Sequence, residues 1–261
     1  MKQLIFSILS LVFSFALSQN KVSLKFQSET VIEADKVYGV DTFETLYFSD
    51  EIGSFYKKSA DTTISYANFQ LGKISSANAF NPLKINLFYK DFNTLVILDN
   101  RLAEIKKIDF NTLPNYKYVT LVSTGYDNFV WLYNQDEQLL ELFDFLTSKT
   151  RIKTVPVESQ ALDLKSDYNY CYLLTEKYLY VYSYFGSLIH KIENTGFTEM
   201  AFSKGNLVLK KENALFLLPK NSKELSRIQT EDLLINQFLV TNETLYIYND
   251  EKLRRYQLKS D

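Results

Sequence analysis

The amino-acid sequence predicts an all-β fold, and within that class a β-propeller of about six irregular blades, each an antiparallel meander. Short segments rich in leucine, aromatic and β-branched residues recur along the chain and are separated by polar turns. They recur about every 40 residues, which is the length of a propeller blade. No long segment keeps a 3.6-residue apolar period, so few helices are expected. The same pattern allows two alternatives, seven blades or an assembly of two-sheet β-sandwiches.

Residues 1–18 differ in composition from the rest of the chain. Lys2 is followed by an uncharged apolar stretch that ends in Ala16-Leu17-Ser18. A basic start, an apolar run and small residues at its end are typical of a secretory signal peptide, so we predict cleavage after Ser18. The alternative is a membrane anchor, but the run is short for spanning a bilayer and no stop-transfer charges follow it. Residues 19–261 then form a single propeller domain.

The predicted repeat is a hairpin followed by a further strand. Strands 86–89 and 95–98 flank a polar connector, and a strand with basic residues follows at 105–108. The leucines that mark the second hairpin strand of each repeat are Leu46, Leu95, Leu139, Leu179, Leu215 and Leu245. Residues 22–26 form an alternating strand without a nearby partner. We expect residues 19–30 to close the last blade, because such pairing removes an exposed strand edge.

Composition and charge exclude some functions. The chain has 29 basic and 31 acidic residues and a formal net charge of −2, whereas nucleic-acid binding needs a basic surface. After residue 18, no segment is apolar and long enough to span a membrane. Only 7 residues are glycine, fewer than familiar propeller families use in their turns. Asn, Asp and Lys are therefore expected to take the turn positions.

The sequence lacks the motifs of catalytic and cofactor-binding sites. Its only histidine, His190, and its only cysteine, Cys171, each lie in a strand pattern and are predicted to be structural. Zinc sites and His-based catalysis need such residues beside specific partners. Adjacent acids such as Asp50-Glu51 lie in predicted turns, and neighbours on a strand would point to opposite faces. We expect no enzymatic activity, no cofactor and no metal.

Two groups of residues are candidates for contact with a partner. Aromatic side chains at strand ends and turns supply large contact area at low entropic cost. These candidates are Phe92, Tyr126, Phe129, Tyr184, Phe185 and Tyr248. Cations recur on the last strand of the repeat, which a propeller places at its circumference, and include Lys106, Lys107, Arg254 and Arg255. They either protect exposed strand edges or contact an acidic partner or lipopolysaccharide phosphates.

The Ser18-Gln19 junction and the segment NPLKINLFYKDFNTLVILD at 81–99 resemble exported β-propeller-like proteins of Bacteroidota. Bacterial lipoproteins are acylated on a cysteine at the mature N-terminus, and none lies near this junction. The resemblance therefore implies an exported protein, periplasmic or outer-membrane-associated, that is not a lipoprotein.

The function expected from these observations is a non-catalytic scaffold for protein partners in envelope biogenesis or an outer-membrane complex. Its architecture would be similar to the propellers of the outer-membrane β-barrel assembly machinery and of the Tol system, although no motif residues match either. The alternative is a carbohydrate- or small-ligand-binding propeller, or a hydrolase whose acids converge only in three dimensions.

Overall fold

The computed structural model describes residues 21–220, 222, 224–230 and 233–260. The predicted signal peptide, residues 1–18, lies outside this part. The helices of the described residues are three short 3-10 turns, η1 (Phe69–Leu71), η2 (Lys90–Phe92) and η3 (Phe110–Thr112). In the described part of the chain, no helix is long and apolar enough to cross a membrane. The rest is strands and turns, so the all-β prediction is confirmed.

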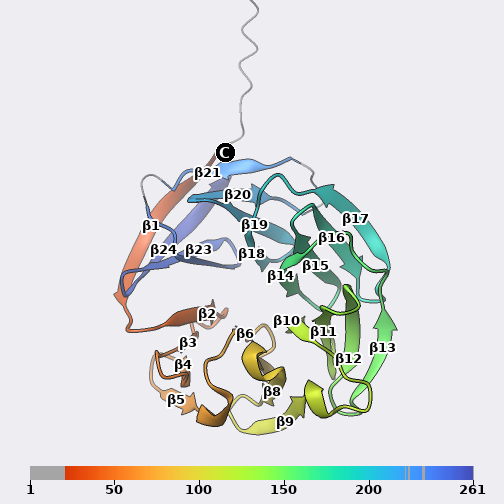
Figure 1. Cartoon of the computed structure of the whole chain (residues 1–261). Coiled ribbons are helices and arrows are strands. Elements are labelled where there is room, and N and C mark those ends of the chain that lie inside the picture. The colour runs from red at the N-terminus through yellow and green to blue at the C-terminus, as the bar shows by residue number, and fades with distance from the viewer. Residues whose placement is uncertain (1–20, 221, 223, 231–232, 261) are drawn as a thin grey trace, which may run out of the picture.

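The strands form six four-stranded antiparallel units arranged in a ring (Figure 1). Unit 1 contains β2 (Lys36–Val40), β3 (Leu46–Ser49), β4 (Phe55–Lys58) and β5 (Thr63–Tyr66). Unit 2 contains β6 (Ser76–Asn78), β7 (Ile85–Tyr89), β8 (Thr94–Leu98) and β9 (Glu104–Asp109). Unit 3 contains β10 (Val119–Thr124), β11 (Phe129–Asn134), β12 (Leu139–Asp144) and β13 (Lys149–Lys153). Unit 4 contains β14 (Ala161–Ser166), β15 (Tyr170–Thr175), β16 (Tyr178–Ser183) and β17 (Leu188–Glu193). Unit 5 contains β18 (Glu199–Ser203), β19 (Asn206–Lys211), β20 (Ala214–Leu218) and β21 (Ser226–Ile228). Unit 6 contains β22 (Gln237–Thr241), β23 (Thr244–Asn249), β24 (Lys252–Ser260) and the N-terminal strand β1 (Lys21–Val31).

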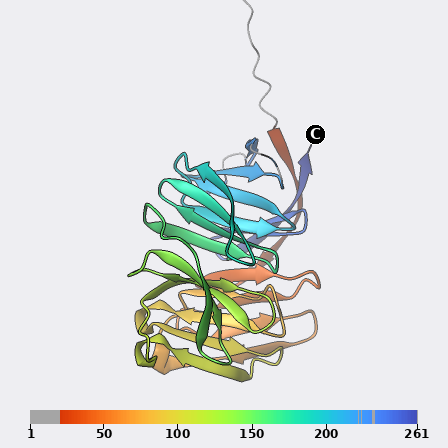
Figure 2. The same cartoon turned by 90° about the vertical axis from the view of Figure 1, so that its right-hand side faces the viewer.

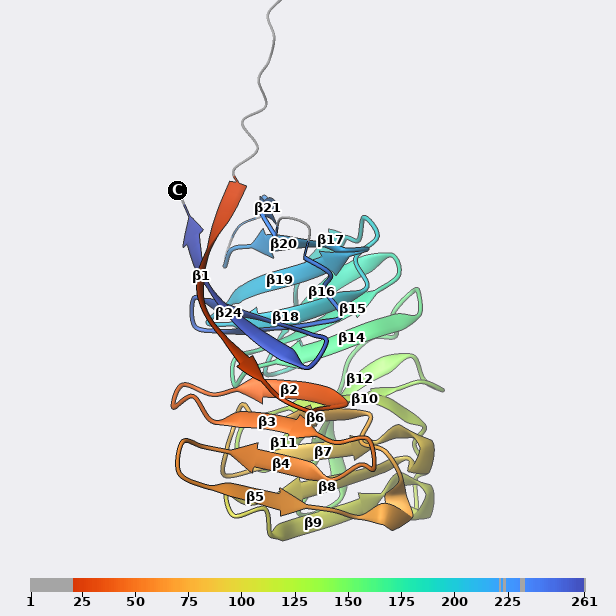
Figure 3. The same cartoon turned by 90° about the vertical axis from the view of Figure 1, so that its left-hand side faces the viewer.

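The predicted count of about six irregular blades differs from the structure, because the six units make five sheets. Units 5 and 6 share one eight-stranded sheet with the order β18-β19-β20-β21-β1-β24-β23-β22. β1 pairs with β24 in antiparallel fashion from Val22 to Val31. At its start β1 also pairs in parallel with β21, opposite Arg227 and Ile228. This second pairing joins two units that the repeat pattern treats as separate (Figure 3).

The first strand of every unit faces the centre of the ring (Figure 1). β2 contacts β6 and β22, and the contacts continue around the ring through β10, β14 and β18. The hydrophobic core lies between neighbouring units; for example, Phe88 and Ile97 of unit 2 pack with Val130 and Leu132 of unit 3. Seen from the side, β1 and the end of β24 project together beyond the ring (Figure 2).

The strand registers explain why the leucine spacing in the sequence drifts. Leu46 and Leu245 lie on second strands, β3 and β23, whereas the other four marker leucines lie on third strands. The true third strands begin at residues 55, 94, 139, 178, 214 and 252, so their steps are 39, 45, 39, 36 and 38 residues. The leucine steps run from 49 down to 30 residues because the marker changes strand at both ends of the chain.

Turns with left-handed residues take the place of glycine-rich turns. Asp41, Asp50 and Asp99 begin three turns of the same form, in which the aspartate Oδ1 accepts hydrogen bonds from the amides two and four residues later. In each of the three turns, the residue three positions after the aspartate has a positive φ. Only one of these three left-handed residues is glycine. Glu44, with a φ of 63°, is one of the other two.

Candidate binding site: a channel pocket and an aromatic surface

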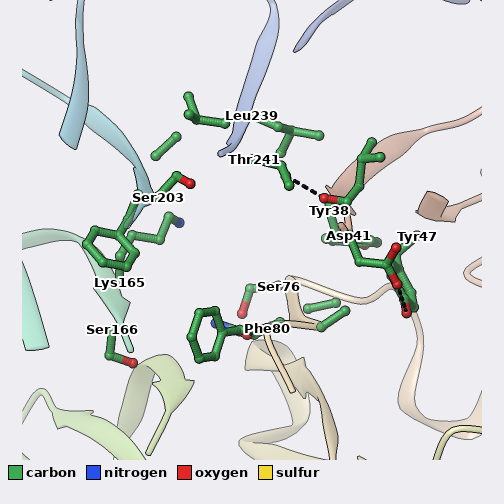
Figure 4. A pocket seen from close by; sticks show the side chains of 18 of the residues that line it. Tyr38, Asp41, Tyr47, Ser76, Phe80, Lys165, Ser166, Ser203, Leu239 and Thr241 are labelled. Atoms are coloured by element: carbon green, nitrogen blue, oxygen red, sulfur yellow. Dashed lines mark hydrogen bonds between the residues drawn. The ribbon is translucent and has the colours of Figure 1, made fainter. Parts of the chain in front are cut away.

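A pocket of about 520 Å³ occupies the centre of the ring. Residues from all six first strands line it, and Figure 4 shows side chains such as Tyr38, Phe80, Lys165 and Ser203 around it. Phe80 and Lys204 lie at strand ends and are exposed, so the pocket reaches the surface. A cavity of this size, lined mainly by apolar groups with a few polar ones, is typical of ligand-binding sites.

The two carboxylates that line the pocket are engaged by the protein itself. Asp41 Oδ1 accepts the amides of Phe43 and Thr45, and Asp41 Oδ2 accepts the Tyr47 hydroxyl at 3.1 Å. Asp163 Oδ2 accepts the Met200 amide at 2.9 Å. Asp163 Oδ1 accepts the amide of Leu164 and the ammonium of Lys165, at 2.8 and 2.9 Å. Both acids therefore take part in hydrogen bonds that hold the pocket wall.

Two lysines, Lys165 and Lys36, lie near Asp163. Lys165 pairs with Asp163 yet keeps a side chain that is 37% exposed. Lys36, at the beginning of β2, donates a hydrogen bond to the Ser75 carbonyl at 2.7 Å. Burial of Lys36, followed by the nearby charge of Lys165, lowers the pKa of the Lys36 ammonium below its usual range.

An aromatic surface lies beside the mouth of the pocket. Since every unit has four antiparallel strands, all first strands end on one side of the ring, which we call the exit face. Turns after first and third strands lie on this face. Six aromatic residues from these turns and the adjoining strand start form what we call the aromatic surface: Phe80, Tyr126, Phe129, Tyr168, Tyr184 and Phe185.

The aromatic surface consists of rings that contact one another across units. Tyr126 packs against Phe129, with ring centroids 5.1 Å apart, and edge-on against Tyr184 at 5.4 Å. Phe80 of unit 2 and Tyr168 of unit 4 form a second edge-on pair at 5.1 Å. The Arg151 guanidinium lies over the Phe129 ring, 5.4 Å from its centroid. These distances fit favourable aromatic and cation–π contacts.

Four of the six aromatic candidates therefore come together, namely Tyr126, Phe129, Tyr184 and Phe185. Phe92 is exposed but lies in the turn between β7 and β8, on the opposite face. The choice of Tyr248 as a surface contact is wrong, because its side chain is buried at 6% exposure and its hydroxyl donates to the carbonyls of Ile32 and Ala34. Sequence patterns missed Phe80 and Tyr168, which meet only because the turns after the first strands of units 2 and 4 converge.

The basic candidates divide into two pairs. Arg254 and Arg255 lie on β24, a third strand, so their placement on the outermost strand is wrong; β1 covers that edge. Their charges are paired inside the chain, Arg254 with Glu29 at 2.8 Å and Arg255 with Glu44 at 2.5 Å. Lys106 and Lys107 do lie on an outermost strand, β9, where Lys106 is half-buried and Lys107 is exposed.

The structure separates the single histidine from the single cysteine, one on the surface and the other in the core. His190 is exposed on β17, and Cys171 is fully buried on β15, where burial raises the pKa of its thiol well above the usual range. Among the described residues, no three His, Cys, Asp or Glu side chains gather in a way that could hold a metal ion.

The ring and its central pocket define this chain as a β-propeller-like protein. No protein-family model matches the chain, and no curated protein matches it. It is similar to the structure of catalytically inactive virginiamycin B lyase from Staphylococcus aureus, with a TM-score of 0.62, 10% identity, and coverage of 93% of this chain and 97% of that one.

It is also similar to a chain of the mitotic checkpoint complex (TM-score 0.57, 9% identity, covering 98% of each chain) and to the computationally designed Ika8 protein (0.56, 12%, covering 91% of this chain and 70% of that one). These likenesses show the fold alone.

Proposed function

We propose that this protein is a non-catalytic scaffold that binds a polypeptide partner through the aromatic surface of its exit face. The observation that carries the proposal is that rings of different units contact one another on the exit face, Phe80 with Tyr168 and Tyr126 with Tyr184. Tyrosine, phenylalanine and arginine are the residue types that dominate the energetic centres of protein interfaces. Arg151, stacked on Phe129, supplies the arginine.

The aromatic surface is suited to this role because its rings are held before a partner arrives. Phe185 is 61% exposed while its neighbour Tyr184 is held by Tyr126 and by the turn hydrogen bond from the Tyr184 amide to the Asn169 carbonyl at 2.8 Å. Pre-ordered side chains lose little entropy on binding, which favours affinity.

We further propose that the protein is exported and works in the bacterial envelope, periplasmic or associated with the outer membrane. The support for this part is the sequence of residues 1–18 and the Ser18-Gln19 junction. The envelope partner would be a protein or a protein complex, not a nucleic acid.

The test compares tagged variants isolated from envelope membranes of the parent cell. Tyr184→Ser combined with Phe185→Ser removes part of the aromatic surface, and Phe92→Ser is the matched control on the opposite face. We expect the same partner to be recovered with the wild type and the control, and its recovery to fall at least about tenfold with the double variant. Equal recovery with all three proteins would rule out the aromatic surface as the interface.

A further inference from the structure

The pocket at the ring centre has hydrogen-bonding capacity that the chain itself does not use. Its two carboxylates already accept bonds from backbone amides, a lysine and a tyrosine hydroxyl. The Ser166 hydroxyl donates within the wall, to Ser123 Oγ and the Thr124 carbonyl, and the Thr241 hydroxyl donates to the Val40 carbonyl. The two carboxylates and these two hydroxyl hydrogens are thus already bonded within the wall.

Two lysine ammonium groups at the pocket keep hydrogen-bond donors that the described residues do not use. Lys165 uses one ammonium hydrogen on Asp163 and has further hydrogens to offer. Lys204, directly after β18, lines the pocket and is exposed, and no carboxylate in the described part of the chain lies within ion-pair distance of it. β14 and β18 are neighbours in the ring, so Lys165, Ser203 and Lys204 stand on one side of the pocket.

The other walls are largely apolar, and their one carboxylate, Asp41, already accepts two backbone amides and the Tyr47 hydroxyl. Phe80, Leu121 and Leu239 come from three other units and line the same cavity. A pocket with a cationic side and apolar walls matches a molecule that is negatively charged at one end and hydrophobic over its body.

We propose that the channel pocket binds a small organic anion with a compact apolar body, whose carboxylate or comparable group is held by Lys165 and Lys204. This goes beyond the proposed scaffold function and does not depend on it. The apolar body lies against the walls that contain Phe80 and Leu239. Charge-assisted hydrogen bonds supply the selectivity for an anion over a neutral molecule of the same shape.

The test is isothermal titration calorimetry with three molecules of one shape, namely 2-naphthoate, the neutral 2-naphthamide and the cationic 2-naphthylmethylamine. We expect naphthoate to bind the wild-type protein at least about tenfold more tightly than the other two. Equal binding of the three molecules, or no heat with naphthoate at millimolar concentration, would overturn the proposal.

Variants locate the site. Lys165→Met and Lys204→Met are each expected to weaken naphthoate binding about tenfold, whereas Lys149→Met, which removes one exposed charge on β13 outside the pocket, leaves it unchanged. Should Lys165→Met fail to melt like the wild type, the exposed Lys204→Met carries the test alone. Unchanged affinity in Lys204→Met, or an equal loss in Lys149→Met, would contradict the assignment. Because the purified protein and a small molecule suffice, failure here leaves the polypeptide interface standing.

Discussion

At the scale of single residues, the least expected feature is a buried ion pair in unit 3. Glu141 is fully buried on β12, and its Oε2 accepts the Lys117 ammonium at 2.6 Å. Its Oε1 accepts the side-chain amide of Asn134 at 2.9 Å, and its Oε2 also accepts the Thr150 hydroxyl. Lys117 precedes the first strand of the unit, so the pair fastens that incoming segment to the third strand. The only sequence signal was a glutamate within a run of leucines.

Removing the charge of Glu141 should destabilise the protein strongly. Glu141→Gln keeps an acceptor for Asn134 but leaves the Lys117 ammonium buried without a counter-charge, at a cost of about 3 kcal/mol. The matched control is Glu137→Gln in the same unit, whose pair with Lys153 is nearly half exposed and should contribute at most about 1 kcal/mol. Urea unfolding measures both. Equal losses of unfolding free energy in the two variants would contradict the role of the buried pair.

The same pair predicts an acid dependence of stability. Burial raises the pKa of Glu141, but the hydrogen bonds from Asn134, Lys117 and Thr150 and the charge of Lys117 outweigh it, so the net shift is downward. The unfolded chain, with a glutamate pKa of about 4.3, then binds the proton more readily than the folded one. The contribution is present above that value and is lost as the pH falls through the lower, folded pKa. The difference in unfolding free energy between wild type and Glu141→Gln should shrink between pH 5 and about pH 3; a constant difference over this interval would contradict the shift.

At the scale of elements, two features recur in this glycine-poor chain. Non-glycine residues adopt positive φ in the turns, and asparagine side chains bind the backbone of the segment that enters the next unit. Asn93 Nδ2 donates to the Lys117 carbonyl at 2.6 Å, and Asn93 Oδ1 accepts the Val119 amide at 3.1 Å. Asn213 holds Leu233 and Ile235 of the next incoming segment in the same way, at 2.9 and 2.8 Å. The scarcity of glycine was visible in the sequence, but this recurring clamp was not, because its partners lie in irregular segments.

Turn residues with positive φ offer a direct test of this account. Gln138, exposed between β11 and β12, has a φ of 54°, a conformation that costs an L-residue about 1 kcal/mol. Gln138→Gly should therefore raise the free energy of unfolding by about 0.5 kcal/mol, the gain being reduced by the greater freedom of glycine in the unfolded chain.

The opposite change serves as the contrast. Gly186 has a φ of 76°, and an added Cβ would lie 2.6 Å from Ile152 Cγ2, so Gly186→Ala should lower the melting temperature. A stabilised Gly186→Ala, or a destabilised Gln138→Gly, would show that these turns are not under the backbone constraint described here.

At the scale of the whole molecule, the repeat length and the strand content were predictable and the joining of sheets was not. Hairpin strands could be found from local patterns such as 86–98, but Leu46 and Leu245 look like the other marker leucines although they lie on a different strand of the unit. The parallel contact of β1 with β21 involves only two residue pairs and joins opposite ends of the chain. No local pattern specifies such a contact.

The N-terminal strand should control the stability of the ring. β1 supplies the outermost strand of unit 6, and Val22 is buried in a core cluster with Ile228 and Tyr256. A chain that begins at Ile32 would expose the edge of β24 and lose this packing. We expect a lower melting temperature and concentration-dependent association, measured by calorimetry and size-exclusion chromatography. A truncated chain that stays monomeric and melts like the intact one would contradict the closing role of β1.

The most direct test of the central claim, that a polypeptide partner binds the exit face, is site-specific photo-crosslinking in the parent cell. A photoreactive phenylalanine analogue replaces Phe185 or Tyr168 on the exit face, or Phe92 or Phe69 on the opposite face, where both native side chains are also exposed. We predict one discrete crosslinked partner band from Phe185 and Tyr168 and none from Phe92 and Phe69. Crosslinks of equal yield from both faces, or only from the opposite face, would contradict it.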